Sequence, residues 1–247
     1  MTGSQPRYAP LVPSPRARAR LALGGAFALV GCAAAGAAPK LPPPVPHLVN
    51  ANEALGDPYG GRFPLEDALA GLPAQGPIKA RLVTDEGDVD CVLDLRHAPL
   101  TVANFVGLAR GLRPFLGDDE QWHTEPYYEN LWWHRAIDGQ FVQTGRRGKQ
   151  ATGGFLIQDE LSYGDSFDRG GVLAMANTGV EHSGSVQFFI TTSPVPHLEG
   201  EHTIFGQCDG EATVRQLERR AADGDHPRLL RVEITREPPP APESSGP

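Results

Sequence analysis

Runs of alternating apolar and polar residues fill the chain from Ile78 onward, and this alternation restricts the fold more than any other feature. Because successive side chains of a β-strand point to opposite faces, Ile78, Ala80 and Leu82 should share one face. The segment TDEG then predicts a turn, and a second alternating run follows it. The apolar residues of that second run are Val89, Cys91, Leu93 and Leu95. The two runs predict a β-hairpin with one face in the core and one in water.

Further short strands and two helices are expected along the rest of the chain. The strand candidates lie at residues 132–137, 141–143, 172–176, 187–192, 203–208 and 230–234. An amphipathic helix is expected at 101–110, with Thr101 as its N-cap and Gly111 after its end. A second helix is expected at 211–222. Its inward residues are Val214, Leu217 and Ala221. Many short strands with only two helices predict a mainly β fold, an antiparallel sheet closed into a barrel, because closure removes unpaired strand edges.

The charge balance argues against one class of partner. The 247 residues carry 22 Lys and Arg against 30 Asp and Glu, which gives a formal net charge of -8. Sequence-independent binding to a phosphate backbone requires clustered basic residues in excess. Nucleic acid is therefore not expected as a partner.

The N-terminus reads as an export signal. Arg16, Arg18 and Arg20 precede an apolar run at 21–30 that is too short to span a bilayer, and Cys32 follows it. The segment LVGC resembles the lipobox of bacterial lipoproteins, in which the signal peptide is removed before a cysteine that then carries the lipids. A plain secretory signal with an incidental cysteine is the alternative. Both predict export, and lipid on Cys32 would place the protein in the envelope, at the periplasmic side of an outer membrane if the cell has one.

Export changes how the other two cysteines are interpreted, because thiols outside the cytoplasm tend to oxidise. A disulfide between Cys91 and Cys208 is one hypothesis, and it requires Cα atoms within about 7 Å of each other. Two buried free thiols are the other hypothesis.

The composition divides the chain into five segments. These are a signal peptide at 1–31, an extended Ala/Pro-rich tether at 32–50, an N-terminal extension with one short helix in PLEDALAGL at 51–77, the folded domain at 78–236 and a disordered tail at 237–247. No function is predicted for the extension.

Five sequence motifs of the folded domain together resemble those of one family. They are APLTVANFVGLARG, PYYENLWWHRAIDGQFVQTG, GVLAMANTG, GSVQFFITT and HLEGEHTIFG, in this order. In order and separation they resemble cyclophilin-type peptidyl-prolyl cis-trans isomerases over residues 78–236. The resemblance implies an eight-stranded antiparallel barrel capped by two helices. It also implies an enzyme that acts on proline-containing segments of exported proteins.

The implied reaction explains why the motifs contain no nucleophile. An X-Pro bond rotates over a barrier of about 18–20 kcal/mol that amide resonance causes, and no covalent bond is broken. A catalyst has only to favour the twisted bond over the planar one. A guanidinium beside the proline nitrogen can do so, because it is always charged and its donors are fixed. Neither a cofactor nor a metal is expected, and the protein is expected to be a monomer.

The resemblance assigns the site residue by residue. Its catalytic positions fall on Arg135, Gln143, Asn177, Phe189 and His202. Its substrate-contacting positions fall on Gln140, Phe141, Ala176, Gln187, His197 and Leu198. Arg135 would bond near the imide nitrogen and Phe189 would form the proline floor. The alternatives are a surface pair of Arg135 with Asp138 and plain core packing of Phe189.

Three positions depart from the family pattern. Gln140 stands where the family usually has a phenylalanine, which either shrinks the apolar floor or leaves Phe141 to form it. His197 stands where many members have a tryptophan that binds cyclosporin. Val186 is an extra residue that would bulge the strand entering the site. Activity with altered substrate preference is therefore expected. The basic loop with Arg146, Arg147 and Lys149 either gives the enzyme a preference for acidic substrates or is simply a solvated loop.

The same residues also fit two rival functions less well. A metal hydrolase could use His197, Glu199, Glu201 and His202, but the two histidines do not have the spacing of an H-E-x-x-H helix. The stronger rival is a cyclophilin-like module that binds proline peptides as a chaperone with weak or no turnover, because a fold does not fix a function.

Overall fold

The computed structural model describes residues 39–162 and 166–238. The predicted signal peptide, Cys32 and the tail from residue 239 lie outside the described residues. The fold lies within the compact unit Ala38–Pro247. No helix among the described residues is both long and apolar enough to cross a membrane.

One antiparallel sheet forms the body of this unit. Its strands, with their bounds, are β1 (Ile78–Thr84), β2 (Gly87–Leu93), β5 (Leu131–Trp132), β6 (Arg135–Ile137), β7 (Phe141–Thr144), β8 (Val172–Met175), β9 (Phe188–Thr191), β10 (Ile204–Cys208) and β11 (Arg228–Arg236). Neighbouring strands follow the order β5-β11-β1-β2-β10-β8-β9-β7-β6. Two short strands that the sequence did not predict, β3 (Phe115–Leu116) and β4 (Trp122–His123), pair separately.

The predicted alternation holds in the first hairpin. Ile78, Ala80 and Leu82 are buried in β1, and Val89 and Cys91 are buried in β2. Cys91 lies opposite Cys208 of β10, with the two Cα atoms 3.9 Å apart, and their sulfurs form a disulfide. The structure therefore has the disulfide rather than two free thiols.

The predicted closed barrel of eight strands differs from the observed ladders. The sheet has nine strands, and its two outer strands in the ladder order are β5 and β6. Only Trp133 and His134 separate these strands along the chain, and within the described residues no backbone ladder joins them. The fold is mainly β with a curled sheet, and its closure stays a prediction.

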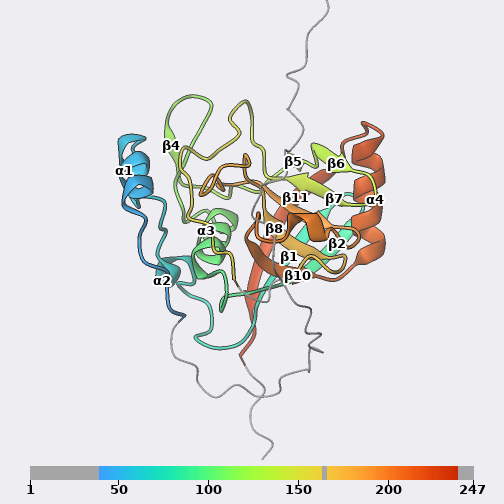
Figure 1. Ribbon diagram of the computed structural model, residues 1–247, viewed down its shortest axis with the longest axis horizontal. Coiled ribbons are helices and arrows are strands. Elements are labelled where there is room, and N and C mark those ends of the chain that lie inside the picture. The colour runs from blue at the N-terminus through green and yellow to red at the C-terminus, as the bar shows by residue number, and fades with distance from the viewer. Residues whose placement is uncertain (1–38, 163–165, 239–247) are drawn as a thin grey trace, which may run out of the picture. The chain divides into compact units, whose positions relative to one another are not determined.

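The helices are α3 (Pro99–Ala109), α4 (Glu211–Ala222), α1 (Pro46–Ala54), α2 (Leu65–Ala68) and a 3-10 turn, η1 (Pro196–Leu198). Of these, α3 and α4 contact the sheet, and α2 contacts α3. Figure 1 shows α4 beside β6 and β7, which it contacts, and α1 at the opposite side of the folded unit. The bounds of α4 and its inward Val214, Leu217 and Ala221 are as predicted.

The first predicted helix, α3, is not amphipathic, because all eleven of its residues are buried. Nor is Thr101 its N-cap, since the helix starts at Pro99 after Ala98. The carboxylate of Glu160 caps it instead, accepting hydrogen bonds from the backbone N–H groups of Leu100 and Thr101. A residue remote in sequence thus supplies the cap.

The N-terminal extension is part of the fold. The predicted extended tether at 32–50 ends early, because α1 already begins at Pro46 and buries Leu48. Asn52 of α1 donates to the carbonyl of Leu156 and accepts from its backbone N–H, at 2.9 and 2.7 Å. The helix predicted in PLEDALAGL shortens to the four residues of α2, and Leu65 and Leu69 pack against the core.

Candidate active site

The β6–β7 hairpin places the predicted arginine and glutamine opposite each other. Arg135 and Gln143 are direct partners in its register, and Arg135 Nη1 donates to Gln143 Oε1 at 2.9 Å. The Arg135 guanidinium carbon lies 4.9 Å from the centre of the Phe141 ring. Gln143 Nε2 donates in turn to Gln187 Oε1 at 2.9 Å. A charged donor therefore lies against an aromatic ring and is held by a chain of amides.

An apolar cluster separate from the main core lies beside this hairpin. The ring of Phe189 is its centre, 5.0 Å from the Phe141 ring and 6.1 Å from the stacked Phe167 ring. The other buried members are Val172, Ala174, Val195 and Leu198, with Ile137, Ala176 and Ile204 partly buried against them. Phe188 points to the opposite face and packs in the main core, as strand alternation requires. Phe189, not Phe188, therefore lies in this cluster, at the position predicted for the proline floor.

His202 contacts the edge of this floor. Its ring is 5.1 Å from the Phe189 ring at a nearly perpendicular angle, and its Nδ1 lies 2.9 Å from the carbonyl oxygen of Met175. A carbonyl oxygen only accepts, so Nδ1 carries the proton. Burial lowers the pKa of His202, which favours the neutral ring.

Asn177 follows Ala176 of the cluster, and its side chain is held by two backbone groups. Its Nδ2 donates to the carbonyl of Glu201 at 2.7 Å, and its Oδ1 accepts from the N–H of Gly179 at 3.0 Å. The preceding residue, Ala176, donates its backbone N–H to the carbonyl of Gln187. These bonds fix the chain on either side of Asn177, the predicted peptide-binding position.

The three departures from the family pattern have different outcomes. Phe141 is 6% exposed and packs on Phe189, so Phe141 rather than Gln140 supplies an aromatic ring to this cluster. His197 is exposed in η1 next to buried Leu198. Val186, predicted to bulge the strand entering the site, is fully buried and lies before β9 begins, and the pairing of β9 itself with β7 and β8 has no register shift.

Sequence reasoning missed two polar residues that the structure places at the site. His134 lies 3.1 Å from Gln187 Oε1 through Nε2, and burial lowers its pKa. The only feature of the sequence that could have indicated His134 is its position next to Arg135. Glu218 of α4 is buried and accepts hydrogen bonds near the β6–β7 turn. No sequence pattern pointed to Glu218, because its contact crosses 78 residues of chain.

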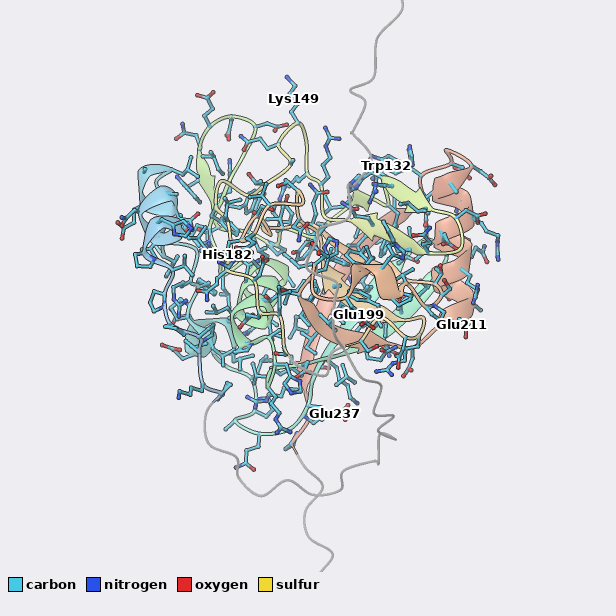
Figure 2. All side chains as sticks on the ribbon, viewed as in Figure 1. Trp132, Lys149, His182, Glu199, Glu211 and Glu237 are labelled. Carbon is cyan, nitrogen blue, oxygen red and sulfur yellow. A yellow bond between two sulfur atoms is a disulfide. The ribbon has the colours of Figure 1, made fainter. Side chains whose placement is uncertain are left out.

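The basic loop has divided roles. The Arg147 guanidinium lies over the Phe115 ring and pairs with Glu125 at 2.7 Å, so it is not simply solvated. Figure 2 shows Lys149 at the tip of the loop with its side chain pointing away from the fold. In the described part of the chain, no three His, Cys, Asp or Glu side chains are grouped to hold a metal ion.

A guanidinium against an apolar aromatic cluster, on a curled antiparallel sheet, is the arrangement that the sequence predicted for a non-covalent isomerase of X-Pro bonds. The family model of cyclophilin type peptidyl-prolyl cis-trans isomerases matches residues 79–237. The chain therefore belongs to this family, whose reaction is the cis-trans isomerisation of X-Pro bonds.

Individual relatives agree with the family match. Peptidyl-prolyl cis-trans isomerase A of Mycobacterium tuberculosis is 38% identical over 156 residues, which span 59% of this chain and 83% of the relative. Peptidyl-prolyl cis-trans isomerase B of Streptomyces anulatus is 40% identical over 155 residues, 62% of this chain and 88% of the relative. A crystal structure of a cyclophilin type isomerase from Cryptosporidium parvum, determined in the presence of the dipeptide Ala-Pro, matches with a TM-score of 0.55 and 29% identity. The match covers 64% of this chain and 99% of the chain in that crystal structure.

Proposed function

We propose that the domain binds a proline ring on Phe189 and Phe141 and eases the X-Pro bond out of planarity with Arg135. The observation that carries this proposal is the Arg135 guanidinium 4.9 Å from the Phe141 ring, beside the buried Phe189 floor. Twisting the bond leaves a lone pair on the proline nitrogen, and a fixed cationic donor stabilises that state more than the planar one.

The other side chains hold the peptide while one half rotates. Gln143 and Gln187 form a row of amides next to Arg135, where they can bond the peptide backbone. In this proposal Asn177 binds the backbone on the other side of the proline, and Leu198 and His202 close the pocket over the ring. Gln187 Nε2 is bonded to the carbonyl of Ala151 at 2.6 Å, which fixes the end of this row.

The test compares wild type with Arg135→Ala by NMR exchange of a proline peptide. A large loss of exchange with retained peptide binding is expected, because the floor is intact. Arg81→Ala is the matched control, since Arg81 is bonded to Asp90 on an exposed part of the sheet. An Arg135→Ala rate equal to wild type would reject the mechanism. A wild type that binds the peptide without exchanging it would favour the chaperone alternative.

We further propose that the clients are proline-containing segments of exported proteins and that a lipid on Cys32 holds the protein at the bacterial envelope. The support is the sequence of residues 16–33 and the Cys91–Cys208 disulfide, since disulfides persist in oxidising compartments. Metabolic labelling with a fatty acid, followed by membrane fractionation of wild type and Cys32→Ser, tests it. Equal membrane recovery and equal labelling of both would reject the anchor.

A further inference from the structure

A buried carboxylate connects α4 to the catalytic hairpin. Glu218 is 3% exposed, and it lies next to Leu217 on the inward face of α4. Its Oε1 accepts a hydrogen bond from the backbone N–H of Gln140 at 3.0 Å and another from Thr192 Oγ1 at 2.6 Å. A buried carboxylate costs free energy unless such bonds compensate it, and an apolar residue would fill the same space without that cost.

The two bonds meet at the turn between β6 and β7. Gln140 lies in this turn, and its carbonyl accepts from the backbone N–H of Thr192 at 2.8 Å. Ser193 donates to the carbonyl of Gly139 in the same turn. The turn is therefore bonded to Thr192 and Ser193, which follow β9, and to α4 through a single carboxylate oxygen of Glu218.

Only one peptide bond separates the anchored Gln140 from the pocket. Phe141, which follows it, packs on Phe189, and Arg135 lies over the same Phe141 ring. The hairpin register pairs Ile137 with Phe141, so a shift of the turn moves both strands together. Fixing the Gln140 N–H consequently fixes the spacing between the floor and the guanidinium.

We propose that Glu218 is a positioning residue: its carboxylate holds the β6–β7 turn so that Phe141 and Arg135 keep their catalytic spacing. This inference rests on the proposed role of Arg135. Glu218 itself touches no substrate, and it acts through the backbone of Gln140 and the hydroxyl of Thr192. A displacement of catalytic groups by about 1 Å can cost on the order of 100-fold in rate.

The experiment measures kcat and KM for Glu218→Met, Glu218→Gln and Leu217→Ala at a temperature where each is folded. Met keeps the length of the side chain and removes the acceptor, so kcat is expected to fall by between about 10-fold and 100-fold with KM little changed. Gln keeps an acceptor oxygen and should retain kcat within about 3-fold, since a neutral acceptor gives a weaker bond in the same geometry. Leu217→Ala removes fully buried core packing one residue away, and it should lower the melting temperature without lowering kcat.

A second readout separates positioning from stability. The Arg135 side-chain Nε–H resonance is expected to shift in Glu218→Met and to stay in place in Leu217→Ala. The proposal is overturned if Glu218→Met keeps the wild-type kcat, or if its kcat falls only in proportion to the unfolded fraction. Arg135→Ala in the same series distinguishes the two proposals: an active Arg135→Ala rejects the mechanism itself, whereas an inactive one beside a normal Glu218→Met rejects only the positioning role.

Discussion

The carboxylate of Asp57 and the guanidinium of Arg113 form a doubly hydrogen-bonded ion pair in which both side chains are 0% exposed. Asp57 lies in the N-terminal extension before the family match begins at residue 79, whereas Arg113 follows α3. Arg113 also stacks over the Phe155 ring at 3.7 Å, and burial lowers its pKa. The extension therefore neutralises a charge inside the isomerase domain.

Removing one partner of this pair is expected to be costly. Asp57→Ala would leave the Arg113 guanidinium buried without its counter-ion, at a cost of about 3–5 kcal/mol in the free energy of unfolding. Urea unfolding measures this loss. Lys79→Ala, which removes an exposed pair with Glu237, is the control and should leave the midpoint unchanged. Equal midpoints for Asp57→Ala and wild type would show that the extension does not stabilise the domain.

The Cys91–Cys208 disulfide is expected to stabilise the sheet. It closes a loop with a sequence separation of 117 residues, which restricts the unfolded chain. Its removal should cost about 2–5 kcal/mol. Thermal unfolding of wild type with and without reductant measures the effect, and the Cys91→Ser/Cys208→Ser variant is the control because reductant should not change its melting temperature. A wild type that ignores the reductant while its disulfide is demonstrably reduced contradicts the prediction.

The Glu160 cap gives a pH dependence whose sign follows from burial. Burial raises the pKa of Glu160 above its ordinary value of 4.5. Between these two pKa values, the folded state therefore holds a proton that the unfolded state has released. The contribution of Glu160 to stability is therefore present below pH 4.5 and declines as the pH rises through its folded-state pKa. Urea unfolding of wild type and Glu160→Gln across this range measures the difference. The advantage of wild type over Glu160→Gln should shrink with rising pH, and an advantage that grows instead would reverse the assignment.

The contrast between Thr101 and Glu160 shows what the sequence could and could not predict. Local patterns predicted the β1–β2 hairpin and α4, and they indicated that only one of Phe188 and Phe189 faces the pocket, because side-chain periodicity is set by neighbouring residues. Thr101 also fitted a local capping pattern, yet Glu160, 59 residues away from it, supplies the cap. The helix begins at Pro99, which is about one turn earlier than the pattern indicated.

Other wrong predictions also result from contacts between residues that are far apart in the sequence. The amphipathic pattern of α3 was wrong because the extension packs against this helix: α2 contacts α3, and the Phe63 ring lies against Gly107, outside the predicted apolar stripe. The site residues Arg135, Gln143, Phe141 and Phe189 came from the family resemblance, and the structure brings them together. Glu218 has no equivalent in any local pattern, since its function depends on where α4 packs.

The pH profile of catalysis is expected to follow the protonation of His202. Burial lowers the pKa of His202 below 6.5, so its ring stays neutral as the pH falls to 6.5 and gains a proton only at lower pH. A charge there would sit against the edge of the Phe189 floor, where proline is proposed to bind. The ratio kcat/KM is therefore expected to be flat above pH 6.5 and to fall below it. His134 also has a lowered pKa, so His202→Gln is needed to separate the two rings. The acid limb should disappear in His202→Gln, and an unchanged limb in that variant would assign the titration to another group.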